Sequence, residues 1–129
     1  MTKVIAMTYD FKVTAESRHI PERSNPDIPI FFFAYWISIT NLSEIPAQLL
    51  NRFWQITDAD GRMNEVKGKG VIGEQPYLKP KQNFKYNSFC PLQTEFGFMN
   101  GHYEMIDKEK KHFKIDIPQF CLSIPNSAN

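Results

Sequence analysis

Three glycines with the spacing GxGxxG form the motif with the best-known chemistry in this sequence: Gly68, Gly70 and Gly73. In dinucleotide-binding folds such glycines allow a tight turn into a helix whose N-terminus meets a pyrophosphate. Pro76 and Pro80 prevent a helix here, so the context excludes a dinucleotide-binding unit. Lys67 and Lys69 leave a weaker alternative, in which backbone N–H groups of residues 67–76 bind a phosphate, a pyrophosphate or a nucleotide. We favour the other interpretation, a bent glycine-rich edge or loop.

Two carboxylates, Asp58 and Asp60, stand directly before Gly61 and Arg62. A calcium-binding loop needs a third oxygen ligand at the next odd position, and Arg62 occupies that position. Aspartate and glycine supply the local hydrogen bond and the positive φ of a tight turn. We therefore expect a hairpin turn here and no metal site.

The histidines and cysteines show no recognised ligand or catalytic spacing; they are His19, His102, His112, Cys90 and Cys121. Convergence of the histidines in space is left open. The cysteines fit buried free thiols in a reducing compartment, although the sequence does not exclude a disulfide between them. No Gly-x-Ser-x-Gly nucleophile motif is present either. We expect no catalytic residue and no cofactor.

An aromatic segment, residues 31–36, supports two interpretations. Most of it is expected to pack in the core. If Phe32 and Trp36 point outward on an uncovered face, they form an apolar patch of the kind that marks a partner surface. Arg52 is expected to cover aromatic surface beside Trp54, with an anion anchor as the alternative.

Period-two alternation of apolar and polar residues dominates the chain and indicates strands. Residues 18–29 contain three prolines and predict a long loop or crossover. Residues 63–67 are charged and only weakly patterned, and residues 108–111 predict a charged hairpin tip. The expected strands are 5–14, 31–40, 48–58, 84–90, 98–107 and 113–122. About seven or eight strands without helices favour an all-β sandwich of two antiparallel sheets, with an immunoglobulin-like or fibronectin-like core around Trp54. A small closed barrel is the alternative.

Length and composition agree with one globular domain. The chain has 129 residues, 42% of them hydrophobic and 22% charged, with a net charge of +1. This balance argues against a nucleic-acid or membrane-surface binder. The apolar run 28–37 is too short to span a membrane, and no secretory signal is visible, so we expect a cytoplasmic protein. We expect one domain over residues 1–124 and a frayed tail over 125–129.

Several blocks of the sequence, taken in order, resemble the bacterial ApaG family. They are residues 41–61, 68–76, 78–80, 84–88, 90–92, 99–105 and 117–120. The match covers almost the whole chain. One departure is Lys81, where the family usually has glycine, which weakens the expectation of a type II turn after Pro80.

This resemblance implies a fibronectin-III-like sandwich. It also implies an association with cobalt and magnesium tolerance through a transport system. Genes for a diadenosine tetraphosphatase and a ribosomal RNA methyltransferase often lie beside the bacterial family members. In eukaryotes the same domain occurs in F-box proteins and in a polymerase-interacting protein, where it looks like a protein-interaction module. We therefore expect a non-enzymatic adaptor with a protein partner, and we leave a homo-oligomer open.

Overall fold

The computed structural model describes residues 2–23, 27–28 and 30–125, and the predicted frayed tail lies mostly outside these ranges. In the described part the chain forms nine strands and one short 3-10 helix. In chain order these are β1 (Val4–Thr8), β2 (Phe11–His19), η1 (Pro21–Arg23), β3 (Phe31–Asn41), β4 (Ala47–Asp58), β5 (Met63–Lys69), β6 (Tyr77–Leu78), β7 (Asn83–Leu92), β8 (Phe96–Asp107) and β9 (His112–Ser123).

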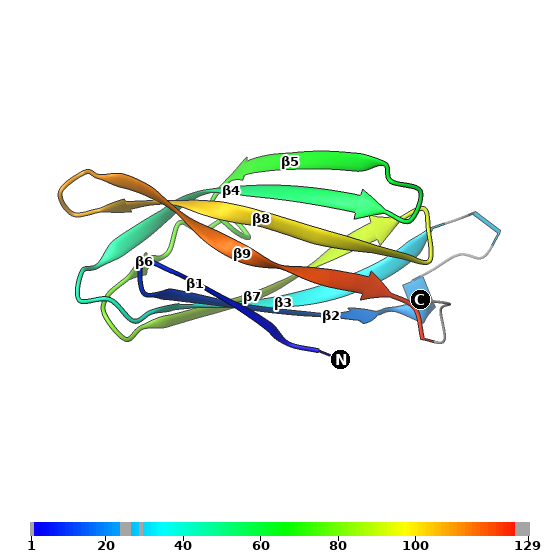
Figure 1. Cartoon of the computed structure of the whole chain (residues 1–129), viewed down its shortest axis with the longest axis horizontal. Coiled ribbons are helices and arrows are strands. Elements are labelled where there is room, and N and C mark those ends of the chain that lie inside the picture. The colour runs from blue at the N-terminus through cyan, green and yellow to red at the C-terminus, as the bar shows by residue number, and fades with distance from the viewer. Residues whose placement is uncertain (1, 24–26, 29, 126–129) are drawn as a thin grey trace.

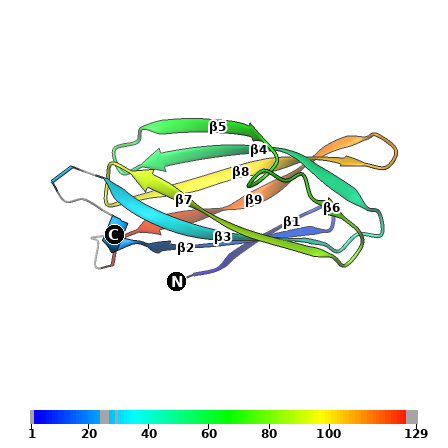
Figure 2. The same ribbon diagram turned by 180° about the vertical axis from the view of Figure 1, so that it is seen from behind.

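The strands form two antiparallel sheets that pack face to face (Figure 1). The four-stranded sheet has the order β1-β2-β3-β7. The five-stranded sheet has the order β5-β4-β8-β9, and β6 pairs with the beginning of β4. Seen from behind, β7 and β3 lie on the near side and β5 lies along the upper edge (Figure 2). The predicted all-β sandwich of two antiparallel sheets is therefore confirmed.

The first predicted strand is in fact two strands, which corrects the expectation for residues 5–14. Tyr9 (φ 49°) and Asp10 (φ 64°) form a two-residue hairpin turn between β1 and β2, because two positive φ values reverse the chain with the twist that paired strands need. Met7 pairs with Lys12, so both side chains lie on the outer face. The period-two pattern of apolar residues continues through the turn without a break. The reversal of the chain direction could therefore not be predicted from that pattern.

Two further segments belong to strands that the sequence did not predict. Arg18 and His19 were expected in a loop. They are instead the last two residues of β2, because they pair with Ala34 and Phe33 of β3. The weakly patterned segment becomes β5, an edge strand whose exposure removes the need for alternating apolar residues.

The turn after Pro80 forms although residue 81 is not glycine. The N–H of Gln82 donates to the carbonyl oxygen of Lys79 at 3.0 Å, and Lys81 has a φ of 73°. Proline at the second turn position and a positive φ at the third define a type II turn. Asn41, which is fully buried, anchors this turn because its carbonyl oxygen accepts the N–H of Lys81.

An aromatic cluster fills the core between the sheets. Trp54 of β4 is 3% exposed, as the sequence predicted. Its ring centroid lies 5.4 Å from Tyr35 of β3 and 5.9 Å from Phe120 of β9, both in edge-on contact. These rings therefore join one strand of the four-stranded sheet to two strands of the other.

Two tyrosine hydroxyls form a hydrogen bond inside the core. Tyr86 of β7 and Tyr103 of β8 belong to different sheets, and Tyr103 is fully buried. Burial raises the pKa of both phenols, so both remain neutral and can share one hydrogen bond. This pair is a polar link between the two sheets.

Tyr103→Phe should destabilise the fold, because it leaves the buried Tyr86 hydroxyl without its partner. We expect a loss of roughly 1–3 kcal/mol in the free energy of unfolding, measured by urea denaturation. The double variant Tyr86→Phe/Tyr103→Phe removes both hydroxyls and should be more stable than the sum of the two single changes predicts. Additive single changes would contradict this assignment.

Candidate functional site

The glycine motif forms the end of β5 and the tight turn that follows it. Val71 and Glu74 exchange two backbone hydrogen bonds of 2.8 and 2.9 Å. Between them, Ile72 (φ 48°) and Gly73 (φ 75°) make a two-residue hairpin turn. Val71 is buried, so the turn is anchored in the core.

Three amides of this segment already donate to backbone carbonyl oxygens. The N–H of Gly70 donates to the carbonyl oxygen of Leu50 at 2.8 Å, while the N–H groups of Val71 and Glu74 donate to each other's carbonyl oxygens. These three amides would have to give up their partners to bind an anion. Phosphate binding at residues 67–76 stays a prediction, and the geometry supports a structural turn.

Arg52 stabilises the same turn through hydrogen bonds to its backbone. Its Nη1 donates to the carbonyl oxygens of Lys69 (3.2 Å) and Gly70 (2.9 Å). A side chain at Gly68 would meet the guanidinium, since a Cβ added there would lie 2.6 Å from Cζ of Arg52. Arg52 therefore has a structural role, but these bonds go to backbone carbonyl groups, and the expected cover of aromatic surface stays a prediction.

The two lysines of the motif are exposed. They alternate with Gly68 and Gly70 along the chain, so their side chains point away from the Arg52 guanidinium. The Lys67 ammonium lies 5.6 Å from the ring centroid of Phe53, on the outer face of the five-stranded sheet. The structure thus separates Lys67 from the turn amides.

Gly70→Val should destabilise the fold through both conformation and contact. Gly70 has a φ of 63°, and an added Cβ would lie 2.2 Å from the carbonyl oxygen of Glu74. We expect a loss of roughly 1–3 kcal/mol in thermal or urea unfolding. Gly73→Val is the matched control, because Gly73 shares the positive φ but has open space around it and should lose less. Equal losses at the two positions would rule out the close contact.

An aromatic face lies on the outside of the four-stranded sheet. We define it as Phe32, Trp36 and Phe89 together with Arg18 and Arg23. Phe32 and Trp36 point outward, because their neighbours Phe33, Tyr35 and Ile37 are buried. Phe89 is 47% exposed. The condition set from the sequence, that Phe32 and Trp36 point outward, is therefore met, and the partner surface itself stays a prediction.

An arginine guanidinium lies over each aromatic ring of this face. The guanidinium carbon of Arg23 lies 4.8 Å from the ring centroid of Phe32 and 5.0 Å from that of Phe89. The guanidinium carbon of Arg18 lies 5.7 Å from that of Trp36. Arg18, Arg23 and Phe89 were not predicted from the sequence as part of this face. Phe89 is the large apolar residue among polar neighbours on its strand face, which was the available signal, but its place opposite Ala34 depends on the register.

A hollow of about 340 Å³ opens beside Trp36. Lys3, Glu16 and Lys85 contribute to its walls. Four cations, Lys3, Arg18, Arg23 and Lys85, lie over the rings or in the walls of this hollow, together with the carboxylate Glu16. The face thus combines apolar area with positive charge.

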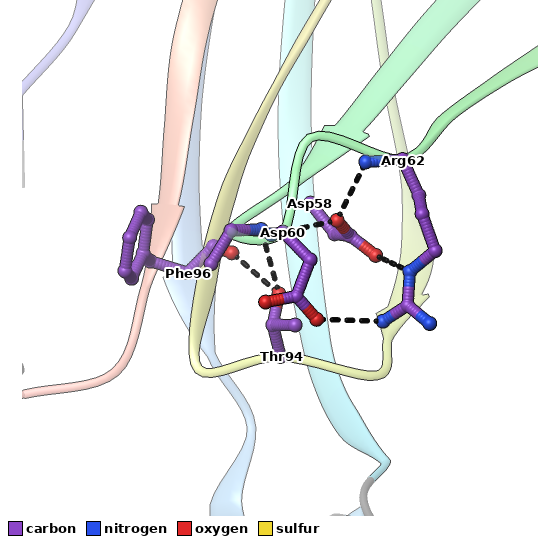
Figure 3. Close-up of polar contacts among 6 residues, drawn as sticks. Asp58, Asp60, Arg62, Thr94 and Phe96 are labelled. Carbon is purple, nitrogen blue, oxygen red and sulfur yellow. Dashed lines mark hydrogen bonds and ion pairs between the residues drawn. The ribbon is translucent and has the colours of Figure 1, made fainter.

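The acidic segment forms the predicted tight turn between β4 and β5 (Figure 3). One carboxylate oxygen of Asp58 accepts the N–H groups of Asp60 (2.9 Å) and Arg62 (3.0 Å). The other lies 2.8 Å from Nε of Arg62, whose Nη2 lies 3.0 Å from a carboxylate oxygen of Asp60. Thr94 supports the turn by accepting the N–H of Ala59. Both carboxylates are therefore paired with Arg62.

These contacts change the acidity of Asp58. Partial burial acts to raise its pKa, but hydrogen bonds from the Arg62 side chain and from the Arg62 and Asp60 amides lower it below the ordinary 3.8. A lowered native pKa means that the charged form stabilises the fold. This contribution is complete above pH 3.8 and disappears as the pH falls through the lower native value.

Asp58→Asn should therefore lose stability relative to the wild type at neutral pH, and the difference should shrink below pH 3.8. Urea unfolding as a function of pH measures it. Arg62→Gln removes the partner of Asp58 instead. It should also make the free energy of unfolding less dependent on pH in the acidic range. If the stability difference between the wild type and Asp58→Asn grew as the pH fell, the charged form of Asp58 would not be the one that stabilises the fold.

The histidines lie in separate surroundings. His102 stacks on Phe53 with ring centroids 4.9 Å apart, and burial together with nearby Lys114 lowers its pKa. Nδ1 of His112 lies 3.3 Å from a carboxylate oxygen of Glu104. Among the residues that the structure describes, no three His, Cys, Asp or Glu side chains are grouped to hold a metal ion. Nor is any helix in this part of the chain long and apolar enough to span a membrane.

The two cysteines are free thiols in different environments. Burial raises the pKa of Cys90 to about 12, so its thiol stays protonated. Cys121 is exposed, which corrects the expectation that both thiols are buried. It lies between the buried Phe120 and Leu122 on β9, so the strand alternation turns it outward.

The fold and these surfaces define a small β-sandwich domain of two antiparallel sheets. A family model described as the ApaG domain matches residues 21–107. The chain is 47% identical to Protein ApaG of Bradyrhizobium diazoefficiens, over 95% of this chain and 94% of that protein. It is 48% identical to Protein ApaG of Methylocella silvestris, over 93% and 92%. A crystal structure of an ApaA protein from Bordetella pertussis superposes with a TM-score of 0.88 at 40% identity, covering 94% of this chain and 98% of that one. The chain belongs to the ApaG domain family.

Proposed function

We propose that this protein is a non-enzymatic interaction domain that binds a partner protein through the aromatic face. The observation that carries the proposal is the stacking of Arg18 and Arg23 on outward-facing aromatic rings. Tryptophan and arginine are enriched among the residues that contribute most binding energy at interfaces. The partner segment is acidic and carries apolar side chains, because the face is both cationic and aromatic.

The energetics of the face agree with a binding role. Covering an exposed phenylalanine completely stabilises a complex by roughly 1.5–3 kcal/mol, and Phe89 keeps almost half of its surface exposed. The arginines are held over the rings, so less side-chain freedom is lost when a carboxylate binds them. A few such contacts are enough for a specific but reversible complex.

The non-enzymatic part of the proposal has separate support. Cys90, the buried thiol, stays protonated at neutral pH, and His102 is stacked on an aromatic ring. The relatives named above carry no enzymatic name. The link to cobalt and magnesium tolerance and the cytoplasmic location rest on the family resemblance, and an adaptor could serve such tolerance without binding the metal itself.

The test compares face variants with a matched control in pull-downs from a lysate of the encoding organism, with quantitative mass spectrometry. Arg18→Glu and Phe89→Ser should each reduce retention of the same protein at least about tenfold. Lys114→Glu reverses a charge on the outer face of the five-stranded sheet and should leave retention unchanged. Equal retention by all three variants, at unchanged melting temperatures, would refute the proposal.

A further inference from the structure

One edge of the five-stranded sheet is the strand β5, and β9 forms the opposite edge. β5 pairs with β4 on one side, and in the described ranges no strand pairs with its other side. Both views show it along the upper margin of the molecule, away from the four-stranded sheet (Figure 1, Figure 2). Most of its seven residues are exposed. An exposed strand edge of this length is a template for pairing with another strand.

The hydrogen bonds at the two ends of the β4–β5 hairpin show which backbone groups are available. The carbonyl oxygen of Arg62 accepts the N–H of Asp58, and the N–H of Gly70 donates to Leu50. Both bonds involve even-numbered residues on the β5 side, and the register between them is continuous. Successive residues of a strand direct their N–H and C=O groups to opposite edges. The odd-numbered residues therefore direct theirs outward: Met63, Glu65, Lys67 and Lys69.

Charge then selects one register for pairing with an identical strand. In an antiparallel pair these outward groups must face one another, so odd-numbered residues lie opposite odd-numbered residues. A pair centred on residue 65 places two glutamates together. One centred on residue 67 places two lysines together at its centre, although each Glu65 then lies opposite Lys69. A pair centred on Val66 places each Glu65 opposite Lys67 of the second copy. Directly opposite unlike charges stabilise a strand pair, and like charges destabilise it.

We propose that two copies of this chain associate through antiparallel pairing of their β5 strands, centred on Val66. The two-fold axis passes between the two valines. Val66 is 40% exposed and lies at a position without hydrogen bonds across the new interface, where opposing side chains come closest. The contact is isologous and closed, as expected for a dimer. It leaves the outer face of the four-stranded sheet open.

Lysine on a strand edge ordinarily prevents such pairing. Here Glu65 supplies the opposite charge two residues from Lys67, on the same side of the strand. The register centred on Val66 is therefore the one without like charges directly opposite each other, whereas the registers centred on residues 65 and 67 each place one pair of like charges together. This selectivity makes a second copy a better fit than a strand of unrelated charge.

Sedimentation equilibrium tests the proposal by charge reversal. The wild type should approach twice the chain mass of 15.1 kDa at high concentration. Glu65→Lys places lysine opposite lysine, and Lys67→Glu places glutamate opposite glutamate, so each should weaken the dimer at least about tenfold. The double variant Glu65→Lys/Lys67→Glu exchanges the charges and should restore dimerisation.

A mixture of the two single variants provides the sharpest control. Each alone should be monomeric, but together they place lysine opposite glutamate at every contact and should form a heterodimer. Unchanged circular dichroism of all variants separates this effect from unfolding.

A monomeric wild type would overturn the proposal and leave the edge for a strand of another protein. A dimer that persists equally in both single variants would also overturn it, because it must then use another surface. Arg18→Glu should leave the dimer intact, so this result is independent of the aromatic face.

Discussion

The hydrogen bond between the hydroxyls of Tyr86 and Tyr103 constrains the rest of the sandwich. Two sheets that meet only through apolar side chains can slide, because hydrophobic burial has no direction. A buried hydroxyl needs its partner at one distance and angle, so this bond fixes β7 against β8. The contact of Trp54 with Tyr35 and Phe120 then fills the remaining space. Once the sheets are aligned, the position of each outward-facing residue follows from strand alternation.

Alternation made much of this architecture predictable. The strands around Trp36, Trp54 and Phe120 were expected from period two, and the turn at Asp58 from its side-chain chemistry. What escaped prediction depended on pairing. The reversal at Tyr9 leaves the period intact, and β5 has no apolar pattern because nothing covers it.

The candidate sites were predictable to different degrees, for the same reason. Phe32 and Trp36 follow from alternation within one strand. The place of Phe89 beside them requires the register of β3 against β7, and the arginines reach the rings from β2 and η1. The GxGxxG spacing pointed to a bend but not to its geometry, a two-residue turn at Ile72 and Gly73 closed by the hydrogen bonds between Val71 and Glu74. Turns and strand alternation can be predicted from nearby residues, whereas contacts between segments distant in the sequence cannot.

The last strand of the chain lies against the first two. The Oγ1 of Thr8 accepts the N–H of Asp116 at 3.1 Å, and the Oγ of Ser17 donates to the carbonyl oxygen of Cys121. During synthesis on a ribosome, β1 and β2 emerge long before their neighbour β9. Contacts this far apart in sequence also slow folding, because long loops must close first. The sandwich is thus completed only after β9 has been synthesised, and until then β9 cannot cover the inner surface of β2.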